Sequence, residues 1–271
     1  MARPRVLTAA DQHADAGSYR QFWGKVGDEF PDLGGAGSTR LYAENEQDLL
    51  RQHLPARAGI RMLKTDLWDE AKNTRILHWA ARQGVDVYGL DVSMPTVVQA
   101  KREFAGDRSP FVVADVRHVP FASGSFDAIY SMGTIEHFDE TEAAVVELAR
   151  LLTPGGRLIL GVPNRHDPFL RPLMVWLLQA RGWYDYGTEK CYSRKDLRRM
   201  LNAAGLTVTA ETGILFIPGW LRMLDLLLHT RWPRWSFITR PAVALFRWLG
   251  ERFPGLRRHG YLLASVGERQ E

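Results

Sequence analysis

The feature that most constrains the fold of this chain is an alternation of short apolar runs with amphipathic segments, from about residue 60 to residue 217. Runs such as IRML, VDVYGL and RLILGV have the length and composition of strands. The segments between them have apolar residues at helical spacing, and each ends at a glycine, a proline or a polar turn. Repeated strand–helix–strand units predict a mostly parallel sheet with helices on both faces.

The regions outside this alternation suggest four parts. Residues 1–58 contain two helical segments and predict a helical cap, which would either cover the sheet edge or act as a lid over a substrate pocket. Residues 59–217 form the α/β core, and 218–258 a basic, tryptophan-rich helical insertion. Residues 259–271 supply the last strand and a tail. The chain of 271 residues is more consistent with one large domain than with two.

Composition narrows the class of protein further. The chain is 45% hydrophobic and 24% charged, as soluble globular proteins are. Its single cysteine, Cys191, excludes an intramolecular disulfide framework and favours a cytoplasmic enzyme. No apolar run is long enough for a signal peptide or a transmembrane helix.

In an open parallel sheet, ligands bind beyond the carboxyl ends of the strands. Asp91 follows the run VDVYGL, where a carboxylate can accept hydrogen bonds from both hydroxyls of a ribose. Asp115 follows FVVA, where it could accept from an adenine amino group or could simply cap a turn. These positions predict a nucleoside site.

Four blocks of this sequence, in order, resemble the class I S-adenosylmethionine-dependent methyltransferases, in particular the ubiquinone-biosynthesis-like small-molecule group (methyltransferase type 11). The blocks are GVDVYGLDVS, FVVADVRHVPFASGSFDAIYSMGTIEHF, LARLLTPGGRLILGVPN and KCYSRKDLRRMLNAAGLTV. The resemblance implies a Rossmann-like α/β fold with a seven-stranded, mostly parallel sheet whose last strand is antiparallel. It also implies S-adenosylmethionine as cofactor, with Asp91 and Val92 at the ribose, Asp115 and Val116 at the adenine, and Met132 nearby.

The turn after the first expected strand departs from the family pattern. The family has an acid and alternating glycines there, whereas this chain has LKTDLWDEA. The methionine end of the cofactor carries an ammonium and a carboxylate. We therefore expect Lys64 to meet the carboxylate, and Asp66 the ammonium or the sulfonium side.

Methyl transfer from a sulfonium is an in-line displacement, for which the enzyme aligns the two reactants and removes a proton. His137, in the loop after the fourth expected strand, is the first candidate for the base, with a structural role in the loop as the alternative. His166, after the fifth strand, is the second candidate. Tyr19, Trp23 and Tyr42 are expected to close the substrate pocket. The histidine spacing does not predict a metal site.

The segment 218–258 holds eight arginines against Asp225 and Glu251, a net charge of +6, so its basicity is local. It also contains four of the nine tryptophans. Its two amphipathic helices would either pack on the sheet edge or lie on an anionic membrane surface. Nucleic-acid binding is not expected, because the segment lacks lysines and a known recognition module.

Together these patterns predict methyl transfer from S-adenosylmethionine to an oxygen, or less readily a nitrogen or carbon, of a small-molecule or lipid-like acceptor. A catalytically degenerate binding protein that docks to a membrane or partner is the alternative. We expect a cytoplasmic location. If the acceptor is lipid-like, we expect the protein to associate with a membrane as well. The sequence does not indicate the oligomeric state.

Overall fold

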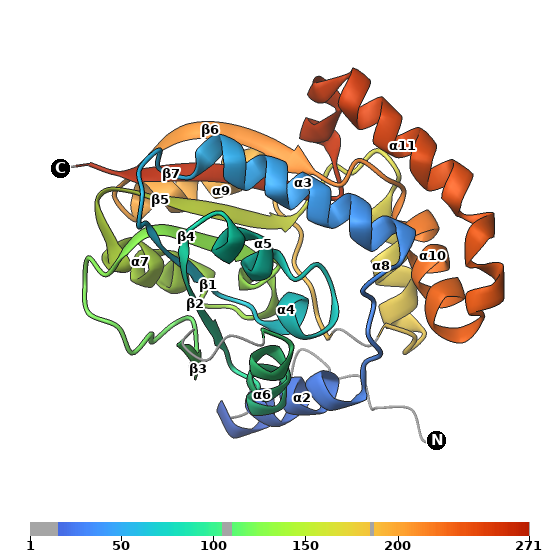
Figure 1. Ribbon diagram of the computed structural model, residues 1–271, viewed down its shortest axis with the longest axis horizontal. Coiled ribbons are helices and arrows are strands. Elements are labelled where there is room, and N and C mark those ends of the chain that lie inside the picture. Colours follow the sequence, from blue (N-terminus) through green and yellow to red (C-terminus); the bar gives the residue numbers. More distant parts are fainter. Residues whose placement is uncertain (1–15, 105–109, 185–186, 271) are drawn as a thin grey trace.

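The computed structural model describes residues 16–104, 110–184 and 187–270, and its centre is a seven-stranded sheet with strand order β3-β2-β1-β4-β5-β7-β6 (Figure 1). Strand β7 runs antiparallel to both of its neighbours, and the other paired strands are parallel. The predicted mostly parallel sheet is therefore confirmed. The strands are β1 (Arg61–Lys64), β2 (Asp86–Asp91), β3 (Phe111–Val113), β4 (Phe126–Met132), β5 (Leu152–Pro163), β6 (Leu206–Ile214) and β7 (Leu262–Arg269).

Helices cover both faces of the sheet, so the central strands are buried on both sides, and every residue of β4 is buried. The helices α3 (Gly37–His53), α5 (Ile76–Arg82) and α6 (Met94–Phe104) contribute to one core cluster. The helices α7 (Thr141–Leu151) and α9 (Arg194–Ala203) contribute to the other. A helix on each side is what repeated right-handed β-α-β connections produce.

The N-terminal part of the described chain consists of α2 (Ala16–Glu29) and α3, which lie on different parts of the core. Helix α2 packs on α6 at Gly27, where a Cβ atom would come within 2.5 Å of the Thr96 hydroxyl oxygen. Only a residue without a side chain allows this close approach. Helix α3 contacts α5, α10 and α11.

The connection between β6 and β7 is a helical insertion, as the sequence predicted. It contains α10 (Gly219–Arg231) and α11 (Arg240–Arg252), with the 3-10 turns η2 (Pro233–Ile238) and η3 (Pro254–His259). Helix α8 (Arg171–Ala180), which follows β5, packs beside α10. These helices stand at one end of the sheet, beyond the carboxyl ends of its parallel strands.

Strand β6 ends earlier than the apolar run LTVTAETGILFI suggests. Leu215 adopts a left-handed backbone conformation, with φ of 61°, and its N–H donates to the side-chain oxygen of Asn45 at 2.9 Å. A strand cannot continue through that conformation. The chain therefore leaves the sheet at Ile214 and passes to α10, which brings the insertion over the strand ends.

Candidate functional site

A cavity of about 630 Å³ lies at the carboxyl ends of the parallel strands. Its walls come from the loops after β1, β2, β3 and β4, from α2 and α3, and from α8 and α10. It brings together most of the site residues predicted from the sequence. These are Tyr19, Trp23, Tyr42, Asp66, Asp91, Val92, Asp115, Val116, Met132 and His137.

The turn after β1 is held by side chains in the absence of glycines. The Leu67 N–H donates to Asp91 Oδ2 at 3.1 Å, and the Trp68 N–H donates to Asp66 Oδ1 at 2.8 Å. The short helix α4 (Trp68–Lys72) follows directly. The amides of this turn thus have acceptors within the protein, so a ligand here would meet carboxylate side chains, among them that of Asp66.

Lys64 is fully buried and is not among the residues that line the cavity. Its ammonium lies 3.2 Å from Asp69 Oδ2 and 3.4 Å from Asp66 Oδ2, and it also donates to the Asp66 carbonyl oxygen. Burial alone would lower the pKa of Lys64, but Asp66, Asp69 and Glu70 outweigh it and raise that pKa. The structure therefore gives Lys64 a place beneath the turn, where it neutralises the acids, and not the direct ligand contact that the sequence suggested.

Asp91 ends β2 and faces the cavity. Its two carboxylate oxygens accept hydrogen bonds from the backbone of Leu67 and Ser93, at 3.1 and 2.8 Å. Each oxygen keeps a second acceptor position, so the carboxylate could still receive both hydroxyls of a ribose. Burial, with the nearby charge of Asp66, raises the pKa of Asp91 to about 7.

Asp115 also lines the cavity, with Val116 beside it. The backbone N–H and the Nε of Arg117 both donate to its Oδ1 at 2.9 Å, and Arg117 Nη2 donates to Oδ2 at 2.6 Å. Burial would raise the pKa of Asp115, but these bonds hold it below its usual value. The carboxylate is therefore ionised near neutral pH and fixed in orientation.

Met132, at the end of β4, is buried and forms part of the cavity floor. The neighbouring strand provides the room, since a Cβ atom at Gly161 of β5 would lie 1.9 Å from the Met132 sulfur. Gly161 therefore lets Met132 stay beneath the ligand space.

His137 lies in the 3-10 turn η1 (Ile135–His137) and faces the cavity. Its Nδ1 is 3.1 Å from the carbonyl oxygen of Thr188. A carbonyl can only accept, so Nδ1 carries the proton and Nε2 is the basic nitrogen. Burial lowers the pKa of His137 below its usual value, which keeps the ring neutral and able to take a proton. Trp23 packs edge-on against the ring, with centroids 4.8 Å apart.

His166, the second candidate for the base, is exposed and does not line the cavity. Its backbone N–H donates to the side-chain oxygen of Asn164 at 2.9 Å, which turns the loop after β5 outward. The Asn164 side chain in turn donates to the Gly260 carbonyl oxygen. The structure thus separates His166 from the other site residues.

Aromatic residues of the N-terminal helices reach the same cavity. Tyr19 and Trp23 come from α2, and Tyr42 comes from α3. Burial raises the pKa of Tyr42 well above its usual value, as do the charges of Asp69 and Glu46. Its hydroxyl is therefore a hydrogen-bond donor at neutral pH. The N-terminal helices thus supply part of the cavity wall.

A second polar group in the cavity, which sequence reasoning missed, consists of Arg171, Glu189 and Tyr184. Two guanidinium nitrogens of Arg171 donate to the two oxygens of Glu189, one of them at 2.9 Å. The Tyr184 hydroxyl donates to Glu189 at 2.6 Å. Arg171 also lies over the ring of Tyr261, at 4.1 Å from its centroid. Arg171, Tyr184 and Glu189 belong to one stretch of the sequence but have no motif spacing, and Tyr261 comes from much further along the chain, so only the fold brings the group together.

The sheet order, the antiparallel seventh strand and a cavity at the strand ends define a Rossmann-like fold. A family model described as a methyltransferase domain matches residues 72–160. This match agrees with the resemblance to the S-adenosylmethionine-dependent methyltransferases that the sequence shows.

Two curated relatives illustrate the similarity. Ubiquinone biosynthesis O-methyltransferase of Sinorhizobium fredii is 30% identical over 51% of this chain and 58% of its own. Demethylmenaquinone methyltransferase of Thermus thermophilus is 32% identical over 47% of this chain and 66% of its own. The chain spans about half the length of the first curated relatives that it matches.

Solved structures share the fold over nearly the whole chain. One is the putative methyltransferase in a complex with the Haloferax volcanii Trm112 methyltransferase activator. It has a TM-score of 0.63 and 21% identity, and the match covers 93% of this chain and 97% of the other. The phosphoethanolamine N-methyltransferase 2 of Haemonchus contortus, with a TM-score of 0.61 and 16% identity, matches over 95% of this chain and 61% of the other.

Proposed function

We propose that the protein transfers the methyl group of S-adenosylmethionine to an oxygen of a small-molecule, lipid-like acceptor. The observation that carries this proposal is that one cavity joins the strand-end carboxylates Asp66, Asp91 and Asp115 to His137. The first three residues suit a nucleoside with a cationic end, and the last suits proton removal from an acceptor.

The charges that line the cavity fit the cofactor. S-adenosylmethionine carries a sulfonium and an ammonium against one carboxylate, so it is a net cation. Acidic side chains outnumber arginines in the wall, which has six acids and the arginines Arg171 and Arg222, although burial raises the pKa of one of the acids, Glu136, well above its usual value. The acids are Asp66, Asp69, Asp91, Asp115, Glu136 and Glu189.

Specific roles follow from these positions. Asp91 would hold the ribose hydroxyls, with Val92 against the sugar. Asp115 and Val116 would hold the adenine, because they lie after the next strand outward in the sheet. Asp66 would meet the cationic end, and Met132 would support the cofactor from below.

The bound cofactor supplies an activated methyl group, and the protein's part is to align the acceptor and take up its proton. His137 has the arrangement that this requires, with Nδ1–H fixed on Thr188 and a neutral Nε2. As the acceptor oxygen attacks the methyl carbon, its proton would pass to Nε2. Glu136 lies 3.9 Å from Nε2. Burial raises the pKa of Glu136 well above its usual value, so this side chain places no negative charge beside the attacking oxygen.

The acceptor side of the cavity has apolar walls. Met174 and Val175 come from α8, and Met223, Leu224 and Leu227 come from α10. Such walls suit a hydrophobic or lipid-like acceptor. The names of the two curated relatives refer to ubiquinone and menaquinone, which supports an acceptor of a similar kind.

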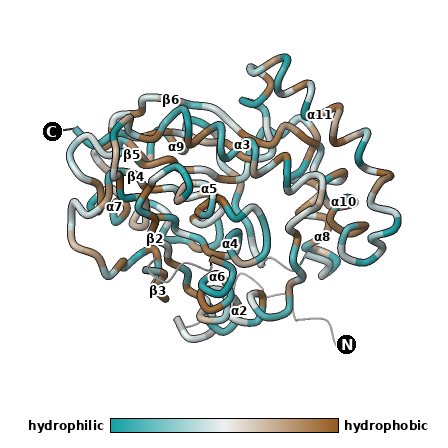
Figure 2. The backbone as a smooth tube through the Cα atoms, viewed as in Figure 1, coloured by the Kyte–Doolittle hydropathy of each residue, from teal (hydrophilic) through white to brown (hydrophobic). Residues whose placement is uncertain are grey.

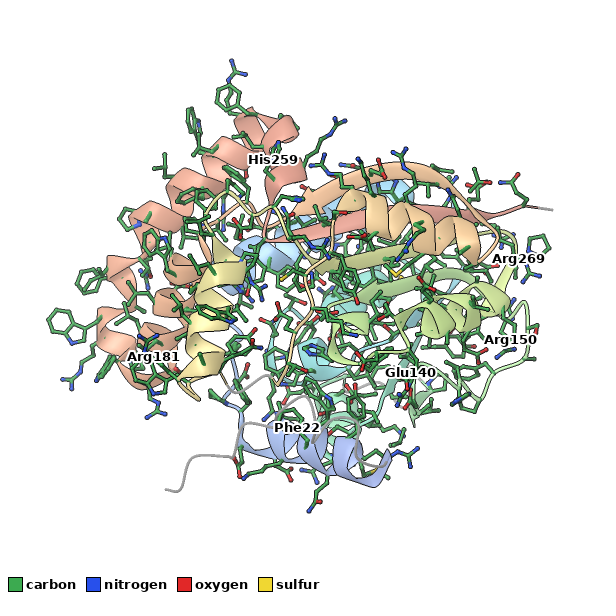
Figure 3. All side chains as sticks on the ribbon, turned by 180° about the vertical axis from the view of Figure 1, so that it is seen from behind. Phe22, Glu140, Arg150, Arg181, His259 and Arg269 are labelled. Carbon is green, nitrogen blue, oxygen red and sulfur yellow. The ribbon has the colours of Figure 1, made fainter. Side chains whose placement is uncertain are left out.

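Helices α8 and α10, which carry these walls, contain hydrophobic stretches (Figure 2). Large apolar side chains are exposed on them and on neighbouring elements, and we call this surface the tryptophan face. It extends over α8, the loop after it, α10, η2 and α11, and large side chains project from these elements (Figure 3). The most exposed members are Leu170, Trp176, Trp183, Trp220, Trp232, Trp235, Phe237, Ile238 and Trp248. Patches of this kind mark interaction sites, and tryptophans suit the headgroup level of a bilayer.

The charge of the tryptophan face favours an anionic lipid surface as its partner. Arg181, Arg231, Arg234, Arg240 and Arg252 are exposed on the same elements. Arginine beside tryptophan and leucine is the composition of helices that lie in the membrane interface. In the described residues, no helix has the length and apolarity to cross a membrane. A protein that rests on the bilayer with this face would bring the apolar cavity wall of α8 and α10 close to a lipid-like acceptor.

The proposal is tested with methyl-labelled S-adenosylmethionine and a panel of hydroxylated quinols and catechols with short or prenyl-length tails, supplied in phosphatidylglycerol vesicles. We expect label in at least one acceptor, with more transfer to the long-tailed members. Cofactor binding without transfer to any member would favour the alternative, a binding protein that docks to membranes. That alternative is not favoured here, because the cavity keeps its acids and a neutral histidine.

A further inference from the structure

Arg222 is the second basic group in the cavity wall, and it is 8% exposed. It projects from α10 toward the first turn of α3. Its Nη1 donates to the carbonyl oxygen of Ser38 at 3.2 Å, and its guanidinium lies over the ring of Tyr42 at 5.2 Å from the centroid. The ring of Tyr261 is 6.0 Å away.

The charge of Arg222 has no counter-ion within the part of the chain that the structure describes. In the described residues no carboxylate forms an ion pair with it, whereas Arg171 in the same cavity is paired in a bidentate manner with Glu189. The acid nearest along α10 is Asp225, but its two oxygens accept from the Ser38 N–H at 2.7 Å and the Thr239 hydroxyl at 2.5 Å. Asp225 therefore uses its two oxygens to bind the start of α3 and Thr239.

A buried cation held only by a carbonyl and aromatic rings is costly unless a ligand supplies the opposite charge. The guanidinium has five N–H donors in a planar fork, which matches a carboxylate or a phosphate. The rings of Tyr42 and Tyr261 flank this fork, and Arg222 lines the cavity.

We propose that Arg222 is the residue of this cavity that binds the anionic group, a carboxylate or a phosphate, of a bound ligand. The inference rests on the proposed function, since the ligands concerned are the cofactor and the acceptor. The cofactor carries a carboxylate at its methionine end, and Tyr42, whose ring lies under Arg222, also feels the charges of Asp66 and Asp69 at the turn after β1. An acceptor would bring its anionic group past the apolar residues of α10.

The cofactor arm of the test measures the affinity of S-adenosylhomocysteine and its decarboxylated analogue by calorimetry. If Arg222 binds the cofactor carboxylate, Arg222→Gln lowers the affinity for S-adenosylhomocysteine at least about tenfold and leaves the affinity for the analogue unchanged. Arg222→Lys keeps the charge and restores part of the affinity. Arg82→Gln, at an exposed arginine in the last turn of α5 that does not line the cavity, is the matched control and changes neither affinity.

The acceptor arm uses the protein saturated with S-adenosylhomocysteine and compares dodecanoate, dodecyl phosphate and dodecanol. If Arg222 binds an anionic acceptor, the two anions bind the wild type more tightly than the alcohol does, and Arg222→Gln removes this preference while Arg82→Gln keeps it. Equal behaviour of wild type and Arg222→Gln in both arms would overturn the inference. A wild type that does not bind S-adenosylhomocysteine would instead contradict the proposed function. In that case, binding of the three dodecyl probes to the protein without cofactor would still test the role of Arg222.

Discussion

At the scale of single residues, the turn after β1 shows how a cofactor site can be built without glycines. Asp66 and Asp91 accept the N–H groups of Trp68 and Leu67, so side chains stabilise the turn and also face the cavity. Lys64 below them offsets the negative charge. The sequence identified these charged residues, but it could not tell the cavity-facing acids from the buried lysine, because both sides of β1 are covered.

The raised pKa of Asp91 predicts a pH-dependent cofactor affinity. Ribose hydroxyls need an ionised carboxylate, and burial holds the pKa of Asp91 at about 7, so protonation below that pH removes the acceptor. We expect the affinity for S-adenosylhomocysteine to fall about tenfold per pH unit below 7 and to level off above it. Calorimetry between pH 5.5 and 8.5 measures this, and Asp91→Asn should bind weakly with no such slope. A flat wild-type profile would contradict the assignment.

The role of His137 predicts a loss of turnover without a loss of cofactor binding. Replacing it with asparagine keeps an N–H donor near the position of Nδ1, toward the Thr188 carbonyl, and removes the basic nitrogen, so kcat should fall by about 100-fold or more. The measurement is single-turnover transfer to an acceptor found by the panel, together with S-adenosylhomocysteine affinity. Because the pKa of His137 is lowered from 6.5, wild-type kcat should decline only in the acid range below that value. An unchanged kcat in the variant would assign His137 a packing role.

At the scale of elements, the order of strands and helices could be predicted because the apolar runs and their polar turns recur along the chain. What the sequence did not reveal is where separate elements meet. Helix α8 contributes Trp176 to the tryptophan face and Arg171 to the cavity, yet nothing in its own pattern indicates either role. The early end of β6 at Leu215 could not be predicted either, since it depends on Asn45 of α3.

The tryptophan face predicts a specific loss of membrane binding. Trp176 and Trp220, on α8 and α10, are 62% and 57% exposed. Changing both to serine removes apolar area from the interface, so partition onto phosphatidylglycerol vesicles should fall at least about tenfold. Co-sedimentation measures this. Val146→Ser, at a position 52% exposed on α7, is the control and should leave binding unchanged.

The arginines of that face add a salt dependence, because surface charges are screened at high ionic strength. Wild-type binding should therefore weaken as salt rises, and should be weaker still on phosphatidylcholine vesicles. Equal sedimentation of the wild type and the double serine variant on phosphatidylglycerol would show that the face does not contact the bilayer.

At the scale of the whole molecule, the core beneath the cavity contains acids that stay protonated near neutral pH. Glu46 is buried and accepts a hydrogen bond from the Tyr130 hydroxyl at 2.7 Å. Burial, with the charge of Asp69, raises the pKa of Glu46 to about 8, and burial also raises that of Glu70 to about 8. Such groups favour the folded state less as the pH rises, because the unfolded chain releases their protons first.

This buried acid predicts a stability difference that depends on pH. Between the usual carboxyl pKa of about 4.3 and the folded value of about 8, the wild type should lose up to about 1.4 kcal/mol per pH unit relative to Glu46→Gln. The amide oxygen of glutamine can still accept from Tyr130, so the hydrogen bond is kept. Urea unfolding of both proteins at pH 5, 6, 7 and 8 measures the difference, and parallel curves would contradict a raised pKa at Glu46.

The proposed methyl transfer requires that the protein binds the cofactor. Calorimetric titration with S-adenosylmethionine and S-adenosylhomocysteine measures this binding. We predict micromolar affinity for the wild type, a loss of about 50-fold or more for Asp91→Ala, and wild-type affinity for Asp86→Ala, an exposed acid at the start of the same strand. A folded wild type that binds neither compound would contradict the account and make the binding-protein alternative the leading one.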